Sequence, residues 1–231
     1  MSCCAVIPAY NEDRHIGTVI HETRPYVDAV IVVDDGSTDT TADAARRAGA
    51  FVISLPQRSS KGSAISTGLA HVMRSGPDAA VLLLDADGQH PPACIPAFID
   101  TAARTDAGLV IGNRMKDPGA MPARRQFLNR LCSRVVSSIC RQEIPDVLCG
   151  MRLLSPDLAR SLTLTVAGFE VEVEIVFQAA DLNAGIAEVP IPSVYEPHIR
   201  SHLHLRRDTL AIGGFILRRI VLKKLHHTSG R

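Results

Sequence analysis

Short apolar runs that end in polar residues recur along the first half of this chain, and stretches of helical character such as 40–49 and 61–75 separate them. The runs are CAVIPA (4–9), AVIVVDD (29–35), AFVISL (50–55), AAVLLLDAD (79–87) and GLVIGNR (108–114). Apolar runs without polar alternation are typical of strands that are covered on both faces. Strands that alternate with helices predict an α/β fold with a largely parallel sheet.

The alternation breaks down after about residue 113, where a helical, Arg-rich section begins. A strand-like GMRLLS (150–155) and the stretch EVEVEIVFQAADLNAG (170–185) follow. A chain of 231 residues fits one domain with an appendage. We expect one α/β domain over residues 1–199 and a basic, apolar C-terminal segment over 200–231.

Several classes of protein are disfavoured by what the sequence lacks. The six cysteines are scattered without a C-x-x-C pair, which is typical of buried thiols in a reducing compartment rather than of a zinc site. No signal peptide is expected from the N-terminus, and no apolar window is long enough to span a bilayer. Neither the P-loop motif nor G-x-G-x-x-G is present, which argues against P-loop enzymes and dinucleotide dehydrogenases. We expect a cytoplasmic protein.

Basic residues gather in two blocks of a chain whose net charge is only +1. Residues 114–141 hold seven Lys and Arg against one acid, and residues 200–231 hold eight against one. Two basic blocks on an acidic body suit an anionic partner, and solvated helix faces are the alternative. Because the blocks have few aromatic side chains on which bases could stack, phosphate or anionic lipid is favoured over nucleic acid.

Polar side chains follow the predicted strands, at the edge where open sheets of this kind bind ligands. The acids among them come from three strand ends, and like charges so close raise each other's pKa and cost stability. A divalent cation would resolve the repulsion, and oxygen ligands suit Mg²⁺ or Mn²⁺ better than zinc. Such a cation is most useful where a diphosphate must be bound and then leave. The side chains are Pro8, Ala9, Tyr10, Asn11, Glu12, Asp34, Asp35, Asp85, Asp87, Gln89, His90, Asn113 and Arg114.

Four motifs, taken in order, resemble those of family 2 glycosyltransferases: VIPAYNE, VVDDGSTD, KGSAISTGL and LLLDADGQHPP. Within that family the chain most resembles the dolichyl- and polyprenyl-phosphate mannosyl and glucosyl synthases, because DADGQHPP is similar to their D-A-D-x-Q-H-P-P signature. The segments IGNR, DVLCGMRLLSP and GFEVEVEI are similar to those that follow it in that family. The resemblance covers residues 4–208. It implies a GT-A fold, a Rossmann-like and mostly parallel sheet flanked by helices, with a C-terminal basic helical tail.

The resemblance implies a nucleotide-sugar donor and assigns residues to its nucleoside. The nucleoside pocket would be lined by Pro8, Ala9, Tyr10 and Glu12. Asp35 would hydrogen-bond the base, with Lys61 and Gly62 near that pocket.

A second group of residues would meet the ribose, the diphosphate and the metal. Asp85, Ala86 and Asp87 belong to this group, and Asp87 would be essential for catalysis. The ligands of Mg²⁺ or Mn²⁺ would be Asp85, Asp87 and Gln89, the last two binding directly. Arg200 and His202 would lie in a segment that closes over the donor diphosphate, with Arg200 in a catalytic role.

The resemblance also implies a polyprenyl or dolichyl phosphate acceptor. Arg114 and Arg125 would grip its phosphate, with Asn129 as a polar partner, and Asp146 would orient it or remove a proton. A lipid phosphate is already ionised near neutral pH, so the reaction needs little general base. It needs Arg to hold one anion against another, and a metal to neutralise the departing diphosphate. In-line attack would invert the anomeric centre.

Two other functions fit the same motifs. A family 2 transferase that acts on a soluble sugar, a glycan or a small-molecule hydroxyl would need a carboxylate base, for which Asp146 or Glu172 could serve. A non-catalytic nucleotide-sugar-binding protein would keep the pocket without turnover. The intact Asp85, Asp87 and Gln89 argue against that second alternative.

Residues 210–225 have the pattern of an imperfectly amphipathic helix. The apolar stripe consists of Leu210, Gly214, Leu217, Val221 and Leu225, and Lys and Arg surround it rather than gathering on the opposite face. Either the helix docks this stripe on the domain, or it lies on an anionic membrane surface as a peripheral anchor at the inner face, without a transmembrane helix.

Overall fold

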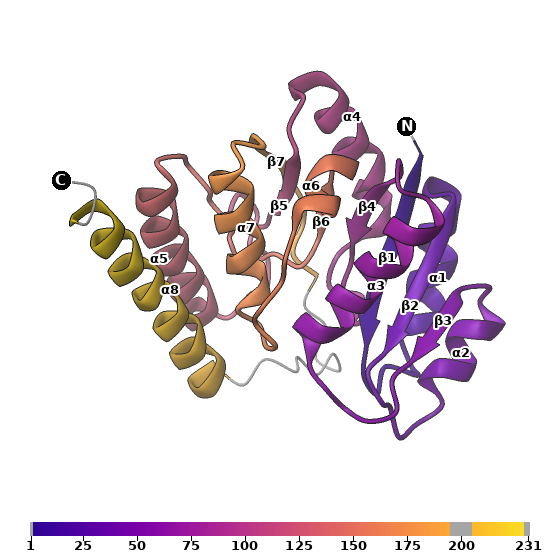
Figure 1. Cartoon of the computed structure of the whole chain (residues 1–231). Helices are drawn as coiled ribbons and strands as arrows, with labels where there is room; N and C mark the ends of the chain where they lie inside the picture. The colour runs from indigo at the N-terminus through magenta and orange to yellow at the C-terminus, as the bar shows by residue number, and fades with distance from the viewer. Residues whose placement is uncertain (1, 195–204, 229–231) are drawn as a thin grey trace.

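The computed structural model describes residues 2–194 and 205–228 (Figure 1). Within these ranges the strands are β1 (Cys3–Ala9), β2 (Ala29–Asp34), β3 (Phe51–Ser54), β4 (Ala80–Leu83), β5 (Leu109–Asn113), β6 (Arg152–Leu154) and β7 (Ile186–Pro190). They form one 7-stranded sheet in the order β3-β2-β1-β4-β6-β5-β7. β6 runs antiparallel to both β4 and β5, and the other neighbouring pairs are parallel. The predicted, mostly parallel α/β sheet is confirmed.

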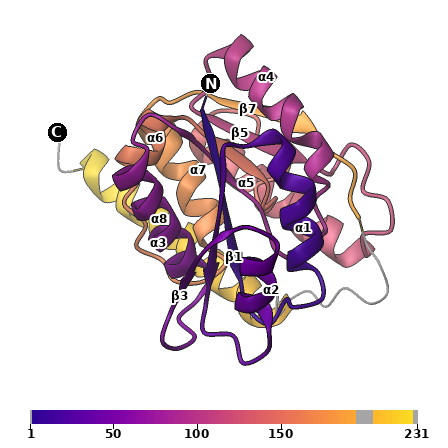
Figure 2. The same cartoon turned by 90° about the vertical axis from the view of Figure 1, so that its right-hand side faces the viewer.

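Helices cover both faces of the sheet. They are α1 (Ile16–Thr23), α2 (Thr41–Arg47), α3 (Lys61–Ser75), α4 (Ile95–Thr105), α5 (Ala123–Cys140), α6 (Pro156–Ser161), α7 (Val171–Asp181) and α8 (Leu205–Thr228), with 3-10 turns η1 (Arg24–Tyr26) and η2 (Pro92–Cys94). α3, α6 and α7 lie on one face, and α1 and α4 lie on the other (Figure 2). α8 packs beside α5 at the end of the molecule away from β3 (Figure 1).

The five apolar runs of the sequence form β1 to β5, and the helical stretch 61–75 forms α3. β4 is buried at all its positions, as expected for a strand with helices on both sides. GMRLLS supplies β6. Two elements are not predicted from the sequence: α4, which begins among prolines, and β7, an edge strand whose residues are mostly only half-buried.

The C-terminal helix docks on the domain through a face other than the predicted stripe. Ile212 and Ile216 belong to the hydrophobic core, and the ring of Phe215 lies 6.1 Å from that of Phe177 on α7. The stripe residues Leu210, Leu217 and Val221 are exposed instead, so the prediction that the stripe docks is wrong. The side chain of Leu225 lies outside the described residues. Within the described ranges, no helix is long and apolar enough to cross a membrane.

The crossing of α3 over β1 depends on Gly68. A methyl group at this position would collide with the Val6 side chain of β1. We therefore expect Gly68→Ala to lower the free energy of unfolding by about 1–3 kcal/mol, the usual cost of overpacking. Chemical denaturation of the Gly68→Ala protein and the unchanged protein measures this difference in the free energy of unfolding.

The matched control is Gly17→Ala on α1, where an added methyl group has nothing within 4 Å. This change should raise the free energy of unfolding by about 0.5–1 kcal/mol, because alanine is the better helix former. Equal stability of the Gly68→Ala protein and the unchanged protein would contradict the close approach of α3 to β1.

Candidate active site

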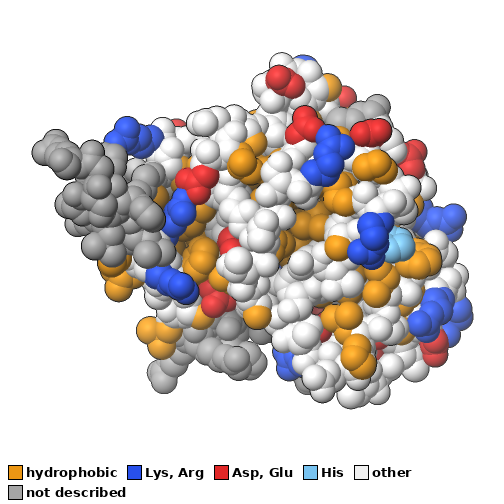
Figure 3. Space-filling model, viewed as in Figure 1, with side chains coloured by type: hydrophobic (Ala, Val, Ile, Leu, Met, Phe, Trp, Pro, Cys, Tyr) orange, Lys and Arg blue, Asp and Glu red, His pale blue; other side chains and the backbone are white. Residues whose placement is uncertain are grey.

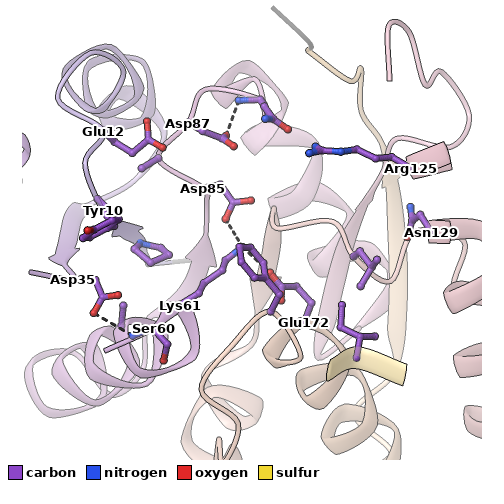
Figure 4. Close-up of a pocket in the computed structure, with 18 of the residues that line it drawn as sticks. Tyr10, Glu12, Asp35, Ser60, Lys61, Asp85, Asp87, Arg125, Asn129 and Glu172 are labelled. Atoms are coloured by element: carbon purple, nitrogen blue, oxygen red, sulfur yellow. Dashed lines mark hydrogen bonds and ion pairs between the residues drawn. The ribbon is translucent and has the colours of Figure 1, made fainter. Parts of the chain in front are cut away.

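The carboxyl ends of four strands open into one pocket (Figure 4). The predicted strand-end residues that line it are Pro8, Ala9, Tyr10 and Glu12 after β1, Asp35 after β2, Asp85, Ala86, Asp87 and Gln89 after β4, and Arg114 after β5. Lys61, Arg125 and Asn129 line it as well. The predicted convergence of acids from three strands is therefore confirmed.

Some of the strand-end side chains support the turns rather than the pocket. The Asn11 side-chain oxygen accepts a hydrogen bond from the backbone N–H of Thr38 at 2.8 Å, and Asp34 accepts one from Ser37 at 3.1 Å. Asn113 donates to a carboxylate of β7 at 3.0 Å. These contacts fix the loops that carry the lining residues.

One end of the pocket combines a buried carboxylate with flat side chains. Asp35 Oδ1 accepts hydrogen bonds from the backbone N–H and the hydroxyl of Ser59, at 2.8 and 2.6 Å, and from the backbone N–H of Ser60 at 3.3 Å. The guanidinium carbon of Arg58 lies 4.1 Å from the centre of the Tyr10 ring. A planar heterocycle with N–H groups, such as a nucleobase, suits this combination.

Lys61 forms the centre of the site. Its Nζ lies 2.7 Å from Asp85 Oδ1 and 2.6 Å from Glu172 Oε1, so it joins the start of α3 to the end of β4 and the start of α7. Burial disfavours a charge on Lys61, but the two carboxylates outweigh this and raise the pKa of Lys61. Gly62, predicted beside the nucleoside, is not among the lining residues. Its N–H donates to the Ala167 carbonyl at 2.7 Å.

Asp85 is held by Lys61 and His90, and its role as a metal ligand stays a prediction. Its Oδ1 pairs with Lys61, and its Oδ2 lies 3.3 Å from His90 Nε2. Burial alone would raise the pKa of Asp85, but Lys61 and His90 bring that pKa below its usual range. Both carboxylate oxygens are thus already engaged.

Asp87 and Gln89 are better placed to meet a cation. Burial, together with the charges of Asp85 and Glu12, raises the pKa of Asp87, although His90 acts in the opposite direction. Asp87 Oδ1 accepts the N–H of Gln89 at 3.0 Å.

These two side chains could form only part of a metal site. Among the described residues no group of three His, Cys, Asp or Glu could hold a metal ion. A divalent cation would therefore need Asp87, the amide oxygen of Gln89 and oxygens of a bound diphosphate.

The other end of the pocket is basic and is built on Asp146. Its Oδ2 accepts the Arg114 Nε at 2.8 Å and the Arg114 backbone N–H at 2.9 Å, and its Oδ1 accepts the other guanidinium branch at 2.9 Å. Asn129 donates to Oδ1 at 2.6 Å. Burial would raise the pKa of Asp146, but Arg114 outweighs it and the pKa is lowered.

Asp146 is 1% exposed and is not among the residues that line the pocket. A carboxylate so engaged is suited to orient Arg114, and it is a poor acceptor for a substrate proton. Arg125 reaches the same end of the pocket from the first turn of α5 (Figure 4).

Two predicted site residues lie outside the described residues, and several residues that line the pocket are not predicted from the sequence. Arg200 and His202 lie outside the described residues, so the closing segment stays a prediction. The unassigned lining residues are Arg58, Ser60, Ala64, Met121, Leu128, Leu148, Phe169, Glu172, Thr209 and Ile212. Most are apolar or come from distant segments, and such residues carry no local signal. Glu172 is an exception, because it lies in the motif GFEVEVEI, which predicts a carboxylate that could act as a base.

Comparison with known proteins gives concordant matches. The family described as glycosyl transferase family 2 matches residues 4–163. Glycosyltransferase AglJ of Haloferax volcanii is 33% identical over 197 residues, which cover 84% of this chain and 63% of that protein, less than two thirds of its length. Undecaprenyl-phosphate mannosyltransferase of Micrococcus luteus is 31% identical over 207 residues, 84% of each chain.

Among solved structures, the chain is similar to glucosyl-3-phosphoglycerate synthase from Mycobacterium tuberculosis in complex with Mn²⁺ and UDP-glucose. The TM-score is 0.70 and the identity 27%, with 97% of this chain and 78% of that chain covered. A protein of the same architecture thus binds a divalent metal and a nucleotide sugar. The fold, the motifs and these matches agree: the chain is a glycosyltransferase with the GT-A fold and belongs to glycosyl transferase family 2.

Proposed function

We propose that this enzyme transfers a hexose from a nucleotide sugar, of the GDP-mannose or UDP-glucose type, to a polyprenyl or dolichyl phosphate with inversion. The observation that carries the proposal is that one pocket joins an acidic cluster to a pair of arginines. Glu12 and Asp87 lie at one end, and Arg125 and Asn129 at the other (Figure 4). Asp146 binds both Asn129 and Arg114, which brings Arg114 to the same end as Arg125. The first end suits a diphosphate bridged by a cation, and the second suits another anion. The name of the Micrococcus luteus relative supports the acceptor.

The donor half follows from the acidic end. The nucleoside would lie against Tyr10 and Asp35, and its diphosphate would lie beside Asp87 and Gln89. Mg²⁺ or Mn²⁺ held by Asp87 and Gln89 would neutralise the departing diphosphate. The complex of the Mycobacterium tuberculosis relative supports both the metal and the class of donor.

The acceptor half follows from the basic end. An acceptor phosphate is ionised near neutral pH and needs no base. Arg114, fixed by Asp146, and Arg125 would hold this anion against the anionic donor. A phosphate oxygen would then bond to the anomeric carbon as the bond to the diphosphate breaks, which inverts the configuration. The arginines offset the repulsion between the two substrates.

A second candidate is transfer to the hydroxyl of a soluble acceptor. One observation favours it: Glu172 lines the pocket with a carboxylate oxygen that makes no hydrogen bond among the described residues, and such an oxygen could take a proton. The Mycobacterium tuberculosis relative is named for an acceptor of this kind.

A panel of donors and acceptors separates the two candidates. UDP- and GDP-sugars are incubated with a short polyprenyl phosphate, with phosphoglycerate or with free sugars, and products are detected by mass. A glycosyl phosphate lipid supports the proposal. Products on the soluble acceptors alone would overturn it. Thermal shifts with GDP and UDP, with and without Mn²⁺, identify the nucleotide.

The lipid acceptor would be met at an anionic membrane surface, with the enzyme bound peripherally at the inner face. Leu210, Leu217 and Val221 of α8 are 76%, 62% and 48% exposed, and Phe127 and Leu131 of the neighbouring α5 are 66% and 48% exposed. Hydrophobic and basic side chains lie together on the end of the molecule formed by α8, at the left in Figure 3. Apolar residues flanked by cations suit an anionic interface, where each cation adds about 1 kcal/mol.

Asp87→Ala should lower turnover by about 100- to 1,000-fold, the scale for losing one electrostatic stabiliser of a transition state. The variant should also lose the Mn²⁺-dependent part of nucleotide binding. Its thermal unfolding midpoint should not fall, because removing one carboxylate from the acidic cluster relieves repulsion. Asp117→Ala, at an exposed position outside the pocket, is the control. Unchanged turnover of Asp87→Ala would contradict the metal assignment.

Arg125→Ala should weaken use of the lipid phosphate by about tenfold to a hundredfold, the cost of one charge-assisted hydrogen bond. The loss should appear in the KM for the acceptor or in kcat, with little change in nucleotide affinity. Arg124→Ala is the matched control, because Arg124 is the exposed neighbour on the same turn and does not line the pocket. Equal losses of donor and acceptor binding would count against the role of Arg125.

Replacing Leu210, Leu217 and Val221 by Ser should abolish sedimentation with anionic liposomes at low salt and spare nucleotide binding. Truncation before α8 is a poorer test, because Ile212 and Ile216 belong to the core. Phe51→Ser, an exposed site on the distant edge strand β3, serves as the control. Sedimentation of the triple variant as strong as that of the unchanged protein would move the membrane contact elsewhere, to the 114–141 block.

A further inference from the structure

Glu172 is a buried carboxylate at the centre of the pocket, and only one of its two oxygens is engaged. Oε1 pairs with Lys61 at 2.6 Å. Oε2 is buried and makes no hydrogen bond to any of the described residues, and the residue as a whole is 5% exposed. A buried carboxylate oxygen without a partner is costly unless a ligand or water supplies a donor.

The position of this side chain is fixed from several sides. Glu172 lies in the first turn of α7, where the helix dipole favours a negative charge. Its own carbonyl accepts a hydrogen bond from the fully buried Arg152 at 2.5 Å. Lys61, which also binds Asp85, holds Oε1. These contacts therefore fix the position of Oε2 as well.

The surroundings favour a neutral ligand with hydroxyl groups. An anionic group beside Glu172 would be repelled by its carboxylate and by that of Asp85. Phe169 lines the pocket as well, with the centre of its ring 5.3 Å from Lys61 Nζ. An aromatic ring for the C–H face of a sugar and a carboxylate for its hydroxyl together recognise a hexose.

We infer that Glu172 accepts a hydrogen bond from a ring hydroxyl of the transferred hexose, and that it selects donor sugars that carry a hydroxyl at that position. Lys61 acts as the positioning residue. The inference rests on the proposed function only in requiring a nucleotide-sugar donor. It applies whichever acceptor the enzyme uses. Donors with an acidic group at the same place would be rejected.

A cavity of about 10 Å³ behind the pocket offers a competing use of the same oxygen. It is lined by Glu172 together with Pro8, Gly150 and Arg152, among others, and has room for one water molecule at most. A water in this cavity would satisfy Oε2 without any contact to substrate. The two uses predict different binding data.

The test compares the affinity for a nucleotide sugar with that for the free nucleotide. Calorimetry with Mn²⁺ gives the Kd of UDP and UDP-glucose, and of GDP and GDP-mannose, for the unchanged protein and for Glu172→Gln. The isosteric amide should weaken binding of the nucleotide sugar by about tenfold, the scale of one hydrogen bond to a charged group, and change that of the nucleotide by less than about twofold. Glu170→Gln, outside the pocket and two residues earlier, should change neither.

Monodeoxy analogues of the bound sugar identify the hydroxyl. One analogue should bind the unchanged protein and Glu172→Gln equally, because both lack the same hydrogen bond. If Glu172→Gln changes the Kd of the nucleotide sugar and that of the free nucleotide by the same factor, Glu172 serves only to position Lys61, and the inference is overturned. If it changes neither Kd, Oε2 binds a water molecule in the small cavity, and the inference is overturned as well. It is also overturned if the unchanged protein binds no sugar nucleotide more tightly than its free nucleotide.

The same experiment separates this inference from the proposed function. Affinities are measured without an acceptor, so failure to glycosylate a lipid phosphate would leave them unaffected. Loss of turnover on a soluble hydroxyl, with unchanged affinities and an altered pH profile, would identify Glu172 as a base and overturn its role in sugar selection.

Discussion

The cluster of acids at the strand ends depends on the ion pair between Lys61 and Asp85. A carboxylate at the end of a fully buried strand is stable only if a cation meets it, and Lys61 meets it from the first turn of α3. The same ammonium group binds Glu172, so one side chain sets the relative positions of α3, β4 and α7. Burial and the negative charge of Asp85 raise the pKa of the neighbouring Asp87, and a divalent cation would favour the ionised form of that side chain.

The basic end of the pocket repeats this arrangement with the charges exchanged. Asp146 is buried behind Arg114 and accepts hydrogen bonds from its backbone and both branches of its guanidinium group, while Asn129 takes a further position on the same carboxylate. The buried carboxylate of Asp146 thus orients the guanidinium group of Arg114 toward the pocket. At both ends a buried partner fixes a charged side chain of the pocket, and such preorganisation is what transition-state stabilisation by charge requires.

Much of this architecture could be predicted from the sequence, because apolar runs ending in acids determine both the strands and the edge where those acids meet. Contacts between distant segments could not be predicted from the sequence. The two acids after β4 look alike in the sequence, and only the fold shows that, within the described part of the chain, Asp85 forms an ion pair with Lys61 and Asp87 forms none. The periodicity of α8 indicates an apolar stripe but does not determine which face of the helix packs on the domain. Ile212 and Ile216, which lie outside the stripe, belong to the core. Thr209 and Ile212 reach the pocket from a segment without a motif.

The reversed direction of β6 has an evolutionary consequence. β5 and β6 are antiparallel neighbours, with Ile111 opposite Arg152, so the chain leaves and re-enters the sheet at adjacent places. The intervening segment carries Arg114, Arg125 and Asp146, whereas the residues of the acidic end lie before it. A single continuous insertion can therefore be replaced or remodelled while strand order and nucleotide pocket are inherited unchanged. Under the proposed function, changes within this one segment would alter the preference for an acceptor and leave the residues proposed to bind the nucleotide in place.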